Sequence, residues 1–94
     1  MAGTITGKIV SISPEGNAVS DIANDRLRVV PTESANVTCD GHVTSKIFPA
    51  DHDQPEMTFM ALMGHSGFLE LTLVGDNISK FLGIQPGVDV TVSW

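Results

Sequence analysis

The residues of this chain best suited to bind a metal ion are its three histidines and a cluster of aspartates. His52 lies between Asp51 and Asp53 in an acidic stretch, and His42 and His65 stand apart from it in the sequence. Zinc sites in proteins use His, Cys and carboxylate ligands at characteristic spacings. Neither a His-x-His pair nor a His-Glu-x-x-His sequence occurs in the chain. The pattern therefore favours a solvated acidic loop, and we predict no metal site.

Cys39 and Glu70 are the residues that could take part in nucleophilic or acid–base chemistry. Cys39 is the only cysteine and precedes His42 by three residues, but a free cysteine is most often a small buried apolar group. Glu70, or the acidic loop around His52, could supply a general base if held beside a concave pocket. The alternation around Glu70 instead predicts an outward-facing strand residue. The chain has no Gly-x-Ser-x-Gly elbow and no Walker lysine, so we predict no catalytic residue.

Asn17 and Phe48 are the residues that could recognise a small ligand. Asn17 follows Gly16 at the start of a predicted strand, and its amide offers a donor and an acceptor that suit the edge of a purine. The alternative is a turn asparagine whose side chain bonds its own backbone. Phe48 opens the polar loop, where its ring could stack on a ligand, and the alternative there is a core residue at a strand end.

Short strands account for most of the sequence. Runs of β-branched and aliphatic residues recur about every eight to twelve residues, as in small barrels and sandwiches. The runs cover residues 4–13, 18–22, 26–30, 36–39, 42–48, 57–63, 68–74 and 88–92. Asp40-Gly41 joins two of them and predicts a hairpin turn, whereas the proline- and aspartate-rich residues 49–56 predict a loop.

One segment changes period from two to between three and four. Ile78, Phe81 and Leu82 fall at helical spacing, with Asp76 as the expected N-cap and Gly83 as the expected stop. The whole pattern predicts an all-β fold. We expect a small closed or partly open Greek-key β-barrel of about seven strands, with one short helix near the C-terminus, that occupies residues 1–94 as a single domain.

The charge balance limits the kind of partner that the chain could bind. Five lysine and arginine residues face eleven aspartate and glutamate residues, and the net charge is −6. Nucleic acids and anionic membranes recruit clustered basic side chains, so we expect neither as a partner. The sequence also shows no secretory signal and no apolar stretch that could span a bilayer. A single cysteine fits a reducing compartment, and we expect a cytoplasmic protein.

Three stretches share their order and spacing with one known domain. Residues 3–22 end in Gly-Asn-Ala-Val-Ser-Asp-Ile, residues 67–72 read Gly-Phe-Leu-Glu-Leu-Thr, and residues 76–92 contain the helix, a Leu-Gly-Ile turn and a valine-rich strand. Together they resemble the C-terminal β-domain of the S-adenosylmethionine hydroxide adenosyltransferases, the family that also contains the fluorinase and the chlorinase. The resemblance covers nearly the whole chain and implies the same fold.

The resemblance also implies which residues would contact a ligand. In the family, a larger N-terminal α/β domain carries the catalytic groups, and the β-domain recognises adenine at an interface between subunits of a trimer. By resemblance, Asn17 is the adenine-contacting asparagine and Phe48 the base-stacking aromatic. Val19 stands where the fluorinase has a tryptophan, and residues 74–76 read Val-Gly-Asp where the family has Arg-Asn-Ala.

Two functions follow for a chain that lacks the catalytic domain. The first is a stand-alone, non-catalytic homologue of the β-domain that binds an adenosyl or nucleoside-type ligand, such as S-adenosylmethionine or adenosine, and needs no cofactor. The alternative is a protein-interaction or oligomerisation module that docks on a partner chain, such as a separate protein like the N-terminal domain. Met57, Met60 and Met63 could form an adaptable surface, although their spacing favours core positions.

Overall fold

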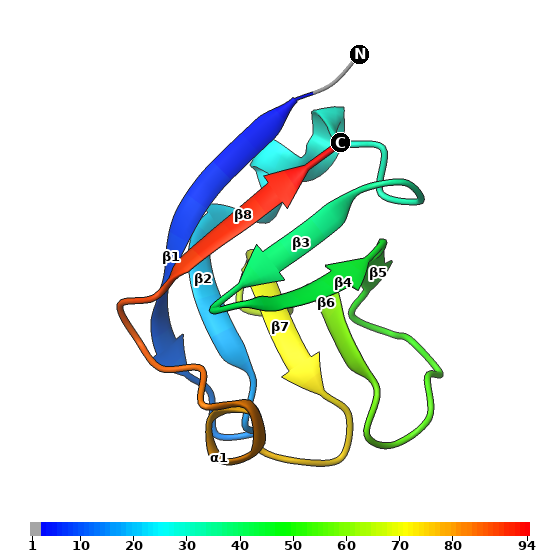
Figure 1. Ribbon diagram of the computed structural model, residues 1–94. Coiled ribbons are helices and arrows are strands. Elements are labelled where there is room, and N and C mark those ends of the chain that lie inside the picture. Colours follow the sequence, from blue (N-terminus) through cyan, green and yellow to red (C-terminus); the bar gives the residue numbers. More distant parts are fainter. Residues whose placement is uncertain (1–2) are drawn as a thin grey trace.

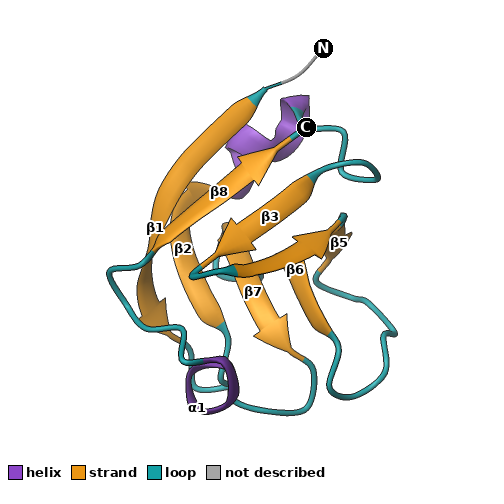
Figure 2. Ribbon diagram, viewed as in Figure 1, coloured by secondary structure: helices purple, strands orange, loops and turns teal. Residues whose placement is uncertain are grey.

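The computed structural model describes residues 3–94, and strands dominate it (Figure 2). The eight strands are β1 (Thr4–Ile12), β2 (Ala18–Ala23), β3 (Asn36–Cys39), β4 (His42–Ser45), β5 (Ile47–Pro49), β6 (Phe59–Met63), β7 (Phe68–Leu73) and β8 (Asp89–Ser93). A 3₁₀ helix, η1 (Asn24–Val29), follows β2, and one α-helix, α1 (Ile78–Leu82), precedes β8. The predicted all-β fold with one short helix near the C-terminus is confirmed.

The strands form one sheet in the order β4-β3-β8-β1-β2-β7-β6-β5, which curls into a nearly closed barrel (Figure 1). All neighbours are antiparallel except β5 and β6. The long strand β1 bends around one side of the barrel. Residues 4–8 of β1 pair with β8, and Ile9, Ser11 and Ile12 pair with β2 across an irregular step in register.

The two sides of the barrel meet between β4 and β6 through side chains. The hydroxyl of Thr44 donates to the carbonyl of Phe59 at 3.2 Å. The ring of His42 packs edge-on against the ring of Phe59, with centroids 5.9 Å apart, and its Nε2 lies 3.0 Å from the carbonyl of Leu82. His42 is thus a structural residue of this seam.

Alternate residues of the strands point inward and fill the barrel with aliphatic side chains, because successive side chains of a strand face opposite sides. The buried cluster includes Ile5, Ile9, Ala18, Ile22, Val37, Cys39, Ile47, Ala61, Leu69, Leu71, Val90 and Val92. Ile78 of α1 also packs into this cluster and fixes the helix against the barrel. The hairpin predicted at Asp40-Gly41 is confirmed, with φ of 51° and 82° at its two turn residues.

The residue that caps the N-terminus of α1 differs from the one that the sequence predicts. Asn77, rather than Asp76, caps the helix, because its side chain accepts a hydrogen bond from the Lys80 amide at 3.0 Å. Gly83 ends the helix in the left-handed conformation as expected, while Phe81 is 57% exposed and does not join the core. No helix among residues 3–94 is long and apolar enough to cross a membrane.

The strand predicted at residues 26–30 is wrong, because the segment is the 3₁₀ helix η1. Leu27 of the helix and Val30, which directly follows it, are buried three residues apart, and this is the repeat of a 3₁₀ turn rather than of a strand. Val29, which the alternation placed on the same face as Leu27, is 76% exposed. The segment starts at Asn24, whose amide N–H donates to the carbonyl of Gly67.

The single strand predicted at residues 42–48 is divided in the structure. Lys46 adopts a left-handed conformation, with φ of 70°, and this bend sends the chain from β4 to β5 on the opposite edge of the sheet. Met57 is also left-handed, with φ of 65°, and β6 begins at Phe59 rather than at residue 57 as predicted. Residues 26–30 are thus not a strand, but residues 42–48 supply two, so residues 3–94 contain eight strands.

In a strand, a β-branched residue is usually more stabilising than glycine, and we expect the opposite order at the bend at Lys46. Lys46→Val should lower the free energy of unfolding relative to Lys46→Gly by about 1–2 kcal/mol, because the left-handed region crowds a side chain. At the exposed β4 position Val43, the change Val43→Gly should instead lower stability, because the residue is in a strand. Urea unfolding of the variants measures both differences. Equal stability of Lys46→Val and Lys46→Gly would contradict the left-handed bend.

Candidate functional site

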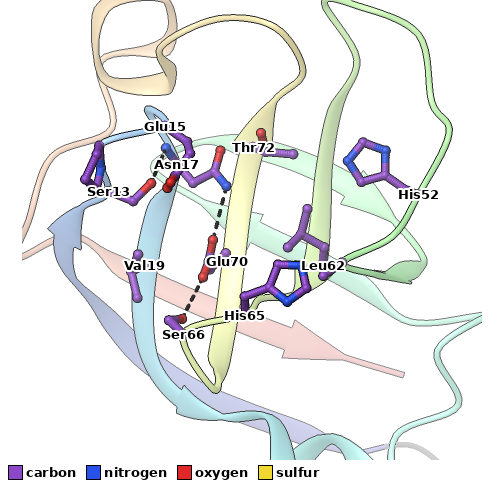
Figure 3. Close-up of a pocket in the computed structure, with 12 residues that line it drawn as sticks. Ser13, Glu15, Asn17, Val19, His52, Leu62, His65, Ser66, Glu70 and Thr72 are labelled. Atoms are coloured by element: carbon purple, nitrogen blue, oxygen red, sulfur yellow. Dashed lines mark hydrogen bonds between the residues drawn. The ribbon is translucent and has the colours of Figure 1, made fainter.

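A pocket of about 520 Å³ lies on the outer face of the barrel wall formed by β2, β7 and β6 (Figure 3). The strands supply its floor with Val19, Leu62, Glu70 and Thr72. Three connections supply the rim: the turn before β2, the loop after β5, and the turn between β6 and β7. The site is therefore built outside the barrel core, where connecting segments cover the sheet.

The register of the sheet explains which residues of the floor are neighbours. Val19 pairs with Glu70, Glu70 pairs with Leu62, and Leu62 pairs with Phe48. Side chains at paired positions lie on the same face of a sheet, so these four form one row across β2, β7, β6 and β5. The first three line the pocket, whereas Phe48, one strand further out, does not.

Glu70 faces outward from the sheet, as the sequence predicts, but it is buried there, with only 7% of the residue exposed. One carboxylate oxygen accepts a hydrogen bond from Asn17 Nδ2 at 3.1 Å, and the other accepts from the Ser66 hydroxyl at 2.6 Å. These bonds compensate for the water that the carboxylate loses on burial.

Asn17 is held by the turn that precedes β2. Its amide N–H donates to the Ser13 hydroxyl at 3.1 Å, and its carbonyl accepts from the Ser13 N–H at 2.8 Å. Gly16, with φ of 91°, passes close to Asn77, and its carbonyl accepts from Ile78 N–H at 2.9 Å. The side chain of Asn17 therefore does not bond its own backbone, as the turn interpretation required, but donates to Glu70.

Gly64 is a necessary part of the site that the sequence analysis missed. A Cβ atom at this position would overlap the carboxylate of Glu70. The backbone of Gly64 is also fixed, because its carbonyl accepts from Asn24 Nδ2 and its N–H donates to the carbonyl of Phe68, both at 3.0 Å. The sequence alone does not reveal that position 64 must be glycine, because a glycine next to a turn is common for other reasons. The requirement comes from the close approach of Glu70 in the folded chain.

The loop predicted at residues 49–56 runs from the end of β5 and contributes to the rim of the pocket. His52 lines the pocket, and its Nδ1 accepts from the Gln54 N–H at 3.2 Å. His65 also lines the pocket, and its Nε2 lies 3.7 Å from Asp51 in an exposed pair that adds little stability. Among residues 3–94, no group of three His, Cys, Asp or Glu side chains is placed to hold a metal ion.

Cys39 is part of the barrel core and lies apart from the pocket lining. Burial, with smaller contributions from Asp40 and Asp89, raises the pKa of its thiol to about 11. The His42 ring points to the carbonyl of Leu82 and not to this thiol. Cys39 is therefore a buried core residue, as the sequence favoured, and His42 belongs to the seam between β4 and β6.

Comparison with known proteins identifies the fold. No family model and no curated protein matches the chain. Among solved structures, an uncharacterized conserved protein from Thermotoga maritima matches 95% of the chain with a TM-score of 0.74 and 19% identity. A conserved hypothetical protein from Thermus thermophilus matches 93% with a TM-score of 0.69 and 21% identity. The chain spans only 35% and 32% of those proteins, so the same small all-β barrel forms part of longer chains.

We expect Gly64→Ala to disrupt the site, because the added methyl group must displace the Glu70 carboxylate. Overpacking of this kind lowers the free energy of unfolding by about 1–3 kcal/mol. Combining it with Glu70→Ala gives the matched control, since removal of the carboxylate leaves room for the methyl group. Chemical denaturation of the two single variants and the double variant measures the coupling. Strictly additive losses would show that the two residues do not interact.

We expect the thiol of Cys39 to be protected in the folded protein. A thiol reagent should label the native protein at pH 8 far more slowly than the protein in concentrated urea. Because the folded pKa of about 11 lies above the ordinary value of 9.0, the thiol contributes stability that is present below pH 9 and is lost as the pH rises toward 11. A Cys39→Ala variant should lack this part of the pH dependence. Rapid, complete labelling of native protein would contradict the burial.

Proposed function

We propose that the barrel is a non-catalytic, cytoplasmic binding domain that holds a nucleoside-type small ligand, such as adenosine or S-adenosylmethionine, in the pocket beside Asn17. The observation that carries the proposal is the amide of Asn17, which Glu70 fixes next to an apolar floor of Val19 and Leu62. The volume of about 520 Å³ lies within the range of small-molecule sites, which also combine apolar walls with a few polar groups.

The amide of Asn17 has hydrogen-bonding capacity left for a ligand. One Nδ2 proton is donated to Glu70, and no residue among the described residues 3–94 donates to the Oδ1 atom. An acceptor oxygen and a second N–H proton therefore remain, and this pair matches the donor and acceptor on an edge of adenine. Val19 and Leu62 would contact the face of the base, which is the contribution that the sequence analysis expected from Phe48.

The remaining polar groups of the pocket suit an uncharged or cationic ligand better than a polyphosphate. The hydroxyls of Ser66 and Thr72 can bond a sugar, and Glu15 and Glu70 make the lining acidic. The whole chain carries a net charge of −6, which repels several phosphate groups. A nucleoside, or a nucleoside linked to a positively charged sulfonium, fits this charge distribution.

Binding, rather than catalysis, is the function that the buried carboxylate favours. An enzymatic role for Glu70 requires a carboxylate in a cleft that can take a proton from a substrate. Glu70 does lie in a pocket, but Asn17 and Ser66 each donate to one of its oxygens. The resemblance to the β-domain of the adenosyltransferases supports the same interpretation, because the catalytic groups of that family belong to another domain.

An interaction or oligomerisation module is the alternative function. It is favoured by one observation: the barrel spans only about a third of the longer solved proteins that it resembles. A separate chain could then dock on a partner that supplies the remainder. The methionines do not form an adaptable surface for this purpose, because Met60 is buried, as their spacing favoured, while Met57 is exposed.

Isothermal titration of adenosine and S-adenosylmethionine into the protein tests the proposed ligand class. We expect binding heat for at least one of them, and Asn17→Ala should weaken the affinity about tenfold or more, because one bidentate contact is lost. Asn36→Ala is the matched control, since Asn36 is an exposed asparagine of β3 whose side chain accepts a hydrogen bond from the Ser45 hydroxyl and does not line the pocket. Absence of heat with both ligands at millimolar concentration would contradict the proposal.

A further inference from the structure

We infer that Glu70 is a specificity-determining residue, which holds the Asn17 amide in one orientation so that the pocket prefers ligands that present an amino group over ligands that present a carbonyl oxygen. This inference rests on the proposed function, because it concerns the same pocket. It goes further by naming the chemical group that the pocket distinguishes and the residue that makes the distinction. Glu70 acts through Asn17 and is a positioning residue.

The orientation of an asparagine amide is decided by its hydrogen-bond partners. Its oxygen and its NH₂ group have nearly the same shape, so a rotation of 180° exchanges an acceptor for a donor with little steric cost. At Asn17 the partner is the Glu70 carboxylate, whose oxygen accepts from Nδ2 at 3.1 Å. The rotated amide would place its oxygen against the carboxylate oxygen of Glu70 in a partly buried site. The charge of Glu70 therefore selects one of the two orientations.

The carboxylate itself is fixed from several sides. The Ser66 hydroxyl donates to its second oxygen at 2.6 Å, and the backbone of Gly64 lies against it. Val19 and Leu62 flank Glu70 on the neighbouring strands, and only 7% of the residue is exposed. Figure 3 shows Ser66, Glu70 and Asn17 linked in a chain of hydrogen bonds, with the Asn17 oxygen directed away from Glu70.

The fixed amide offers an oxygen acceptor at one place in the pocket. A 6-aminopurine places a donating amino group opposite this oxygen and can accept from the remaining Nδ2 proton. A 6-oxopurine bound in the same position places a carbonyl oxygen there, and two acceptors repel each other. Adenosine and inosine have nearly the same shape but differ at this edge, so they are suitable probes. We expect the protein to bind adenosine about tenfold more tightly than inosine.

Substitution of Glu70 by Gln tests the inference by changing the preference between the two ligands. The glutamine side chain has almost the same size, but its amide can donate or accept, so both orientations of the Asn17 amide become available. We expect the affinity ratio of adenosine to inosine to fall from about tenfold toward one in Glu70→Gln. Glu15→Gln is the charge control, because it removes a charge of the same sign from the lining of the pocket while Glu70 still accepts the hydrogen bond from the Asn17 amide. It can change the affinity for both nucleosides, but the ratio should stay at about tenfold.

A second measurement reports the orientation without any ligand. The Asn17 side-chain protons can be followed by NMR in the free protein, where the proton bonded to Glu70 should exchange slowly with water. In Glu70→Gln this exchange should become faster, and in Glu15→Gln it should not change.

The inference is overturned if folded Glu70→Gln keeps the affinity ratio of adenosine to inosine of the unmodified protein, or if it loses affinity for both nucleosides equally. Both results leave the proposed function in place. Failure of the unmodified protein to bind adenosine, inosine and S-adenosylmethionine would instead overturn the proposed function, and this inference with it.

Discussion

A buried carboxylate on the outer wall of the barrel is the constraint on which the site depends. Removing the water around Glu70 costs free energy unless hydrogen bonds replace it, and the replacements come from Asn17 and Ser66. Each donor is presented by a turn next to a strand of this wall. Gly64 is needed because the carboxylate occupies the space of its side chain. One interaction therefore determines the residue types at four positions, which come from two separate parts of the sequence.

The connecting segments make this burial possible by covering the outer face of β2, β7 and β6. The turn before β2 is attached to the first residue of α1 by the bond from Ile78 to Gly16. The loop after β5 is attached to the end of β7 through two backbone bonds, from Met57 to Val74 and from Val74 to Thr58. The barrel thus has an apolar core inside and a smaller, partly polar packing layer outside. We place the ligand in the opening of this outer layer.

The sequence predicts the barrel better than it predicts the site. Alternating Leu69, Leu71 and Leu73 correctly indicate a strand with a buried inner face, but alternation says nothing about whether the outer face is covered. For that reason the pattern predicts that Glu70 faces outward but does not predict that it is buried. Asn17 and Val19, which the sequence does single out, lie together in the pocket.

Other features depend on contacts between distant segments. The resemblance places Phe48 beside Asn17, but the parallel pairing of β5 with β6 puts it beyond Leu62. The 3₁₀ helix at residues 24–29 is held by a turn some forty residues later in the chain, from which Gly64 and Gly67 bond Asn24. No local pattern around residues 24–30 contains this information. The local alternation there favours a strand, and tertiary contacts override it.

Mapping of the backbone amide shifts during addition of adenosine is the most direct test of the claim that this outer layer binds a ligand. The account expects saturable changes centred on Asn17, Val19, Leu62, Ser66 and Thr72, which line one pocket from several different segments. The amide shifts of residues in β3 and β8, on the opposite side of the barrel, should not change. Changes centred on that opposite side, or no changes at all, would contradict the account.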